Sequence, residues 1–216
     1  MKIIKQSHQI LSISDNILGA LEVAGRTCYK SEDKITSNSS EKFVKMLINN
    51  GHHAMIEFGD ITIKFITNRG VTHELVRHRM CSFAQESTRY VRYDGKMEFI
   101  QPVWFSEEML GYHILNAFDP LLIPTDPELV FLKSLCEAEE AYKQLIKIGW
   151  QPQQAREVLP NSLKTEIVVK ANIREWRHIF SLRCAKAAHP QIRALMLSCM
   201  KELQHKLPII FEDINL

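Results

Sequence analysis

The alternation of apolar and polar positions predicts one clear strand in the first third of the chain. Residues 60–67 alternate for most of their length, which places Ile61, Ile63 and Phe65 on one face of an extended segment. The sequence Asn68-Arg69-Gly70 follows and ends the pattern. Weaker strand patterns occur at residues 1–4 and 96–101.

Apolar residues at helical spacing predict four helices. One covers residues 41–50 and stops before Gly51. A longer one starts at Asp126-Pro127, an N-cap followed by a first-turn proline, and runs to Gly149. Residues 173–184 and 190–204 have the same periodicity.

Helices grouped around a few strands, rather than strictly alternating with them, favour an α+β fold. We expect a small antiparallel sheet flanked by several helices. No repeat, low-complexity segment or linker divides the chain, and 216 residues can form one substantial core. We therefore predict a single domain over residues 1–216.

The charge balance limits the kinds of ligand. The chain has 27 Lys and Arg against 25 Asp and Glu, a net charge of +2, which disfavours a broad nucleic-acid surface and leaves room for small phosphorylated ligands. Its five cysteines are scattered and form no C-x-x-C pair, as expected in a reducing cytoplasm. We find no signal-peptide pattern and no apolar run long enough for a membrane span.

One short stretch, residues 77–92, is rich in arginine: it contains four arginines, one histidine and two serines. Guanidinium groups match phosphate oxygens, and serine hydroxyls can complete a phosphate site. A basic face in contact with solvent is the ordinary explanation for such a run. The interleaved Ser82, Gln85, Ser87 and Tyr90 favour an anion site instead.

A second group of polar residues begins at Asn172. Asn172 and Glu175 have the spacing of a capping box, so both could simply start a helix. On that helix Arg174 and His178 share a face, whereas Arg183 lies about half a turn away from Arg174. The helix also carries Arg177 and offers these cations no acidic partner on the same side.

The segment from His73 to His78 superficially suggests a zinc-protease helix. Its two histidines are five residues apart, about 140° around an α-helix, and would not reach one ion. We predict no catalytic metal.

Arg77-His78-Arg79, followed after seven residues by Ser87, resembles the signature of the flavin-dependent thymidylate synthases. Two further blocks, residues 51–58 and 156–183, resemble that family in the same order and spacing. The resemblance implies that seven residues contact the flavin: His52, Arg77, His78, Arg79, Asn172, Arg174 and His178. It implies that six residues contact the nucleotide: Glu74, Gln85, Ser87, Arg89, Arg156 and Arg183.

This chain departs from the family pattern at three positions. Ala54 stands where many members have serine or threonine, Gln85 where many have glutamate, and Glu74 where many have glutamine. A hydroxyl contact from position 54 to the cofactor therefore does not carry over to this chain.

The activity implied by the resemblance is reductive methylation of deoxyuridine monophosphate (dUMP) to deoxythymidine monophosphate (dTMP). Methylenetetrahydrofolate gives the one-carbon unit, FAD gives the hydride, and NADPH reduces the FAD. Arg183 is the expected catalytic group, because a guanidinium is always charged and can stabilise the uracil carbonyls. The family needs no nucleophilic cysteine, so Cys81 is expected to be a packing residue. The resemblance also implies a homotetramer with sites between subunits.

Two other functions fit the same residues. A non-catalytic RNA- or nucleotide-binding module could use the arginines together with Tyr90 and Trp176 as stacking surfaces. The second alternative is a flavin oxidoreductase that acts on another substrate. The sequence distinguishes it from a thymidylate synthase only through the residues expected to bind dUMP, which are Ser87, Arg89, Arg156 and Arg183.

Overall fold

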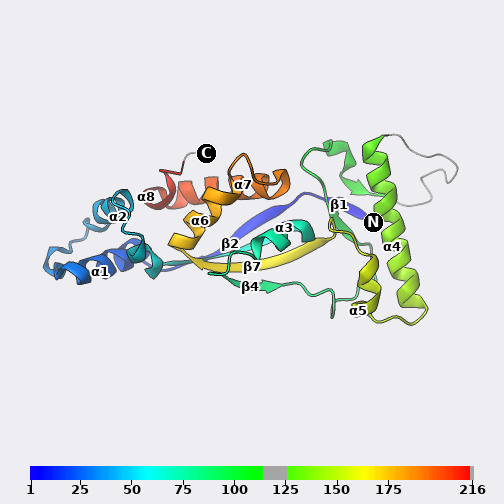
Figure 1. Ribbon diagram of the computed structural model, residues 1–216, viewed down its shortest axis with the longest axis horizontal. Helices are drawn as coiled ribbons and strands as arrows, with labels where there is room; N and C mark the ends of the chain where they lie inside the picture. The colour runs from blue at the N-terminus through cyan, green and yellow to red at the C-terminus, as the bar shows by residue number, and fades with distance from the viewer. Residues whose placement is uncertain (114–125, 215–216) are drawn as a thin grey trace. The chain divides into compact units, whose positions relative to one another are not determined.

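The structure is a computed structural model that describes residues 1–113 and 126–214 (Figure 1). The strands are β1 (Lys2–Ile4), β2 (Ser7–Ile13), β3 (Asp60–Asn68), β4 (Ser82–Gln85), β5 (Glu98–Ile100), β6 (Gly111–Tyr112) and β7 (Lys164–Asn172). The α-helices are α1 (Ile17–Tyr29), α2 (Ser40–Asn49), α3 (Arg69–Leu75), α4 (Pro127–Lys147), α5 (Pro152–Ala155), α6 (Ile173–Arg183), α7 (Pro190–Lys206) and α8 (Pro208–Phe211). Short 3-10 helices are η1 (Glu32–Lys34), η2 (His53–Phe58), η3 (Glu107–Met109) and η5 (Arg156–Val158).

The strands form two sheets. Three strands pair in the order β5-β1-β6, with β5 parallel and β6 antiparallel to β1. Four strands pair in the order β2-β3-β7-β4. The predicted α+β class, with small sheets flanked by helices, is confirmed.

The predicted elements correspond to β3, α2, α4, α6, α7, β1 and β5, with ends that differ by a few residues. Sequence analysis missed β2, α1, α3, β4, β7 and the short elements β6, α5 and α8. In β7 the residues Thr165, Ile167, Val169 and Ala171 are all buried and alternate with more exposed neighbours, so the period of two was present in the sequence. Helix α3 ends at Leu75, so His73 lies on the helix and His78 lies beyond its end.

The chain divides into two compact units. Unit 1 comprises residues 1–7, 66–74 and 85–167, and unit 2 comprises residues 8–65, 75–84 and 168–216. The prediction of a single domain over residues 1–216 stays a prediction.

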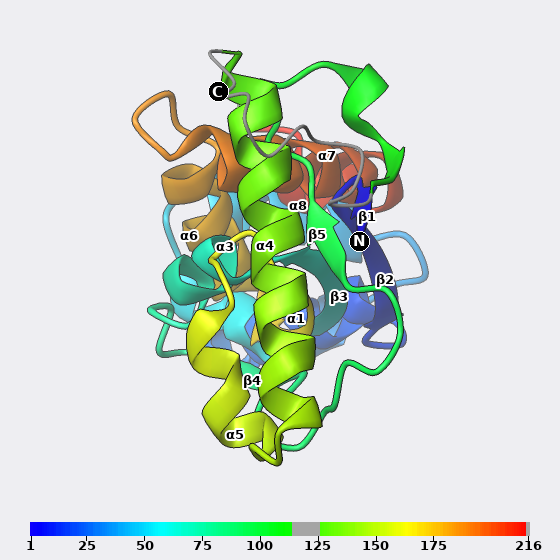
Figure 2. The ribbon, with the colours of Figure 1, turned by 90° about the vertical axis from the view of Figure 1, so that its right-hand side faces the viewer.

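The core of unit 1 forms where α4 covers strands β1 and β5 (Figure 2). Ile3 and Phe99, paired across the parallel strands, are buried with Leu135 and Tyr142 of α4. Glu139 on the same helix lies 2.6 Å from the Met1 ammonium and accepts the Met97 N–H at 2.8 Å. Burial raises the pKa of Glu139, but hydrogen bonds from Met1, Met97 and Lys143 outweigh it and leave the pKa below its usual value.

Helices α1 and α2 pack side by side in unit 2, and α6, α7 and α8 form a second group (Figure 1). Trp176 of α6 stacks on Phe180 with ring centroids 5.8 Å apart, and Phe180 meets Phe211 of α8 edge-on at 5.8 Å. These rings are fully buried. Aromatic packing therefore fixes the rotation of α6 about its axis.

Helix α6 begins where β7 ends. The Asn172 side chain accepts the Glu175 backbone N–H at 2.9 Å, which is N-capping as expected from the sequence. Ile173, Trp176, Ile179 and Phe180 are buried, so the opposite face of the helix presents Arg174 and His178.

Within residues 1–113 and 126–214, the structure contains no helix with the length and hydrophobicity needed to cross a membrane.

Candidate active site

Unit 2 contains a cavity of about 570 Å³ next to the exposed face of α6. Helix α6 contributes Arg174, Glu175 and His178, its N-cap contributes Asn172, and η2 contributes His53 and Glu57. The volume lies within the range of about 300–1,000 Å³ that is usual for small-molecule sites. Arg174 and His178, predicted to share a helix face, do line the same cavity.

The cations of α6 have acidic partners, which sequence analysis did not anticipate. Arg174 donates to Glu57 Oε1 at 2.6 Å. Arg177 donates to both carboxylate oxygens of Asp213, at 2.7 and 2.6 Å, and to the Ile210 carbonyl. The hydrogen bonds from Arg177 lower the pKa of Asp213. The partners come from η2 and from the segment after α8, so inspection of the helix alone could not find them.

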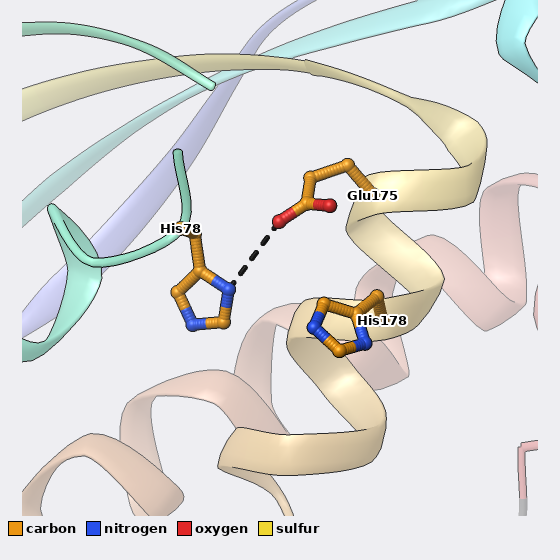
Figure 3. A group of neighbouring side chains, drawn as sticks. All are labelled: His78, Glu175 and His178. Atoms are coloured by element: carbon orange, nitrogen blue, oxygen red, sulfur yellow. Dashed lines mark ion pairs between the residues drawn. The ribbon is translucent and has the colours of Figure 1, made fainter. Parts of the chain in front are cut away.

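His78 lies in the loop between α3 and β4 and is only 6% exposed. Arg183 Nε donates to His78 Nε2 at 3.0 Å. On the other side of the ring, His78 Nδ1 lies 3.3 Å from Glu175 Oε1, and Figure 3 shows this carboxylate pointing from α6 toward the ring. His178, from the same helix, meets the His78 ring edge-on at 5.9 Å.

This environment keeps His78 neutral. Burial, followed by the charges of Arg183 and His178, lowers the pKa of His78 from 6.5 to about 4. Burial also raises the pKa of Glu175, an effect that the nearby His178 partly opposes. The arrangement differs from a full capping box, because the Glu175 side chain faces His78 while its backbone N–H is bound by Asn172.

Three other residues predicted to contact flavin, His52, Arg77 and Arg79, are not among those that line the cavity. Arg77 and Arg79 flank His78 and are exposed. His52 is half-buried and does not line the cavity. The adjacent His53 lines it instead. A flavin-binding role for His52, Arg77 and Arg79 stays a prediction.

His78, Glu175 and His178 also form a cluster in which one ligand atom from each residue lies within 4.8 Å of the others. In this arrangement the lone pair of His78 Nε2 already accepts the Arg183 N–H. A guanidinium in contact with the ring opposes the binding of a metal cation by electrostatic repulsion. Absence of a catalytic metal stays a prediction.

Most of the predicted nucleotide-binding residues lie in unit 1. The Arg89 backbone N–H donates to Ser87 Oγ at 3.2 Å, and Arg89 Nε donates to Gln153 Oε1 of α5 at 3.2 Å. Arg156 Nη1 donates to Thr88 Oγ1 at 3.5 Å. Both guanidinium groups are exposed, so two cations and two hydroxyl groups are gathered within one part of the unit. Such a group of donors suits a phosphate.

Gln85 and Glu74 have different surroundings from these arginines. Gln85 Nε2 donates to Thr72 Oγ1 at 2.9 Å and to Thr165 Oγ1 at 3.3 Å, and both threonines are fully buried. Glu74 lies near the end of α3 and is half-buried. Nucleotide contacts from these two residues stay predictions.

Cys81 is half-buried and close to Glu175. Burial, together with the Glu175 charge, raises the pKa of its thiol to about 12. A thiol with such a pKa carries almost no thiolate near neutral pH and is a poor nucleophile. This agrees with the expectation that Cys81 is a packing residue.

The binding-module interpretation loses one of its stacking surfaces. Trp176 is 0% exposed, and its indole N–H donates to the Ile61 carbonyl at 2.9 Å. A base cannot stack on a ring that the core already encloses. Tyr90 is 76% exposed and could still do so.

Sequence analysis missed Glu57, Gln153 and Asp213 as partners of site arginines, and it treated Glu175 only as a capping residue. Glu57 had one signal, since it falls in the matched block 51–58. Asp213 and Gln153 lie outside every recognised motif, so nothing in their local sequence marked them.

Comparison with known proteins identifies the family. Residues 9–209 match the model of the family described as thymidylate synthase complementing protein. A flavin-dependent thymidylate synthase of Corynebacterium efficiens is 34% identical over 197 aligned positions, which cover 89% of this chain and 78% of that protein. One of the same name from Mycolicibacterium vanbaalenii is 31% identical, covering 94% of this chain and 82% of that protein.

A solved structure supports the same fold. PolB from Streptomyces cacaoi, described as a UMP/dUMP methylase bound with 5-Br dUMP, superposes with a TM-score of 0.76 over 98% of this chain and 96% of that chain, at 21% identity. The resemblance inferred from the three sequence blocks is confirmed by the family model and by the curated relatives. The flavin-dependent thymidylate synthases named above are relatives of this chain. The chain therefore belongs to the thymidylate synthase complementing protein family.

Proposed function

We propose that this protein is a flavin-dependent thymidylate synthase that converts dUMP to dTMP. The main observation is that Asn172, Arg174 and His178, all assigned to flavin by the family resemblance, line one cavity. Relatives named flavin-dependent thymidylate synthase and the fold neighbour described as a UMP/dUMP methylase support the same reaction.

The cavity residues fit FAD. Arg174 supplies a guanidinium group suited to a diphosphate, while Asn172, His53 and His178 supply polar groups that can orient the cofactor. We assign FAD binding to this cavity, with Arg77 and Arg79 as further contacts. When bound, FAD would supply the hydride, after reduction by NADPH.

Arg183 is proposed to stabilise negative charge that develops on a uracil carbonyl. Its guanidinium stays cationic at any working pH, and the bond from its Nε–H to His78 holds it in place. The chemistry requires no thiolate, in keeping with the raised pKa of Cys81.

Ser87, Arg89 and Arg156 are proposed to bind the nucleotide phosphate, with Gln85 and Glu74 nearer the base. Charge-assisted hydrogen bonds contribute roughly 1.5–3 kcal/mol each. Two or three of them could supply much of the about 8 kcal/mol that a micromolar dissociation constant represents, before ordering costs are subtracted. Methylenetetrahydrofolate is proposed as the one-carbon donor.

We also propose that the protein works in the cytoplasm as a homotetramer in which subunits share each site, with residues 1–216 as one family domain. Support comes from the family match over residues 9–209. Light scattering on the purified protein should give a mass of four times the 25.0 kDa of one chain. A monomer that nevertheless makes dTMP would contradict the shared sites.

The decisive experiment begins with the visible absorbance of the purified protein. NADPH is added anaerobically, followed by dUMP with methylenetetrahydrofolate, and dTMP is measured by chromatography. We expect a yellow protein that bleaches with NADPH and reoxidises only when both substrates are present. UMP serves as a parallel substrate because the fold neighbour is described as acting on either nucleotide. A protein that stays colourless after incubation with FAD would refute the proposal.

A further inference from the structure

We propose that Glu175 is a positioning residue that acts on Arg183 through His78, by fixing which ring nitrogen of His78 carries the proton. The inference rests on the proposed function for its kinetic consequence, because Arg183 is assigned there to the uracil ring. Its structural content is independent of that assignment. It concerns three side chains of unit 2, contributed by α6 and by the loop after α3.

The first step follows from the hydrogen bond between Arg183 and His78. A guanidinium has only donors, so the nitrogen that receives its N–H must present a lone pair. Arg183 Nε lies 3.0 Å from His78 Nε2, which makes Nε2 the acceptor. A neutral imidazole has one protonated nitrogen, so the proton of His78 is on Nδ1.

The second step places Glu175 on that proton. Glu175 Oε1 is 3.3 Å from His78 Nδ1, on the side of the ring away from Arg183 (Figure 3). A carboxylate accepts hydrogen bonds and, when ionised, cannot donate one. It therefore favours the tautomer that Arg183 requires. With the opposite tautomer, two N–H groups would face each other and Nδ1 would face the carboxylate without a proton.

Burial makes this choice of tautomer energetically important. His78 is 6% exposed and Glu175 is 9% exposed, so water cannot readily replace a lost partner. The charged and titratable groups around His78 are Glu175, Arg183, His178 and, near Glu175, Cys81. The lowered pKa of His78 agrees with a neutral ring held by these contacts.

Helix α6 supplies both ends of the relay. Glu175 lies in its first turn, where Asn172 binds the Glu175 backbone N–H and leaves the carboxylate directed at His78. Arg183 is the last residue of the same helix. His78 thus bridges the two ends of α6, and His178, which lines the cavity, touches the bridging ring edge-on.

The tautomer can be measured directly. In ¹⁵N-labelled protein, long-range ¹H–¹⁵N correlation spectra distinguish the protonated ring nitrogen of each histidine, and a His78→Gln variant identifies the signals of His78. We expect the Nδ1–H tautomer for wild type near pH 7. The Nε2–H tautomer, or stoichiometric zinc in elemental analysis of the purified protein, would overturn the proposal whether or not the enzyme is active.

Variants of Glu175 test the effect on Arg183. Glu175→Ala should convert His78 to a mixture of tautomers and lower kcat about 10- to 100-fold, the range seen when partners that orient histidines are removed from metal sites. Because Glu175 lines the cavity assigned to FAD, kcat is measured per bound flavin. Glu175→Gln keeps the shape and an acceptor oxygen, so it should retain most of the Nδ1–H tautomer and give an intermediate kcat. This isosteric variant decides the question if the alanine variant does not fold.

Glu202→Gln is the matched control. Glu202 pairs with His8 at 2.9 Å in the same unit and does not line the cavity, so the variant makes the same carboxylate-to-amide change at another carboxylate–histidine pair. It should keep wild-type turnover and the wild-type His78 spectrum. Normal kcat and an unchanged His78 tautomer in both Glu175 variants would overturn the relay. If wild type makes no dTMP, the proposed function fails, whereas the tautomer measurement still tests the relay.

Discussion

Arg183 concentrates three properties in one side chain: permanent charge, a fixed orientation from His78, and a position in unit 2 with the flavin-assigned residues. We predict that Arg183→Ala retains bound FAD but loses nucleotide binding and turnover. Arg183→Lys should rescue little, because a lysine ammonium lacks the planar fork and the Nε–H that meets His78. The measurements are flavin absorbance per chain and single-turnover formation of dTMP.

Arg92→Ala is the control for that experiment. Arg92 belongs to the same arginine-rich segment, but it is exposed and pairs with Asp94. Its loss should leave both readouts close to wild type. Wild-type turnover in Arg183→Ala would remove Arg183 from the reaction.

For Cys81, in contrast to Arg183, we predict that substitution leaves turnover largely intact. Because burial and Glu175 raise its pKa to about 12, its thiol is not expected to act as a nucleophile. Cys81→Ala should keep most of the wild-type kcat, measured as dTMP formed per bound flavin. An inactive variant with full flavin content would instead indicate a covalent route through sulfur.

At the scale of elements, α4 depends on its N-cap. Asp126 accepts the backbone N–H groups of Glu128 and Leu129 at 2.8 and 3.1 Å, ahead of a proline in the first turn. Asp126→Ala should lower the free energy of unfolding by about 0.5–2 kcal/mol, measured by urea denaturation. Asp126→Asn keeps an acceptor oxygen and should lose less. Equal stability of all three proteins would show that the cap contributes nothing.

Helices with strong local signals were the elements best predicted from sequence. The starts of α2 and α4, and the apolar stripes of α6 and α7, depend on residues within a turn or two of one another. β7 was missed although its buried positions alternate, because Val168 joins Ile167 and Val169 in an apolar run that blurs the apolar–polar alternation. The fold class was predictable because it needs only the type and order of the elements.

Contacts between residues far apart in the sequence depend on the fold of the whole molecule, and local sequence patterns could not predict them. Residues 78 and 183 are 105 positions apart, and residues 177 and 213 are 36 apart, yet both pairs are in direct contact. Such contacts depend on the packing of complete elements, for which a single sequence offers no periodic signal. Family resemblance singled out Arg174 and His178, which line one cavity, while the carboxylates that hold the site arginines emerged only from the structure.

Global stability should depend on pH through His78. Its pKa is lowered from 6.5 to about 4, first by burial and then by Arg183 and His178. The unfolded chain therefore binds a proton at His78 that the folded chain resists. The free energy of unfolding should fall as the pH is lowered from about 6.5 toward 4. Above about pH 6.5 the stabilisation from a neutral His78 should be fully present.

Urea denaturation at several pH values, on wild type and His78→Gln, isolates this contribution. The difference between the two proteins is needed because Glu175 has a raised pKa and acts in the opposite direction near the acid end. The wild type should lose more stability than the variant across the window. Parallel curves would mean that His78 titrates alike in both states.

The ion pair between Arg174 and Glu57 at the cavity bears on how an anionic cofactor would bind there. The guanidinium assigned to the cofactor is already engaged by the protein's own carboxylate at 2.6 Å. Loading an anionic cofactor there is an exchange of one negative partner for another rather than occupation of a vacant cation. Under the proposed assignment, Glu57 competes with the cofactor for Arg174, and the affinity of this contact should reflect the difference between two ion pairs. Glu57→Gln should then strengthen cofactor binding through Arg174.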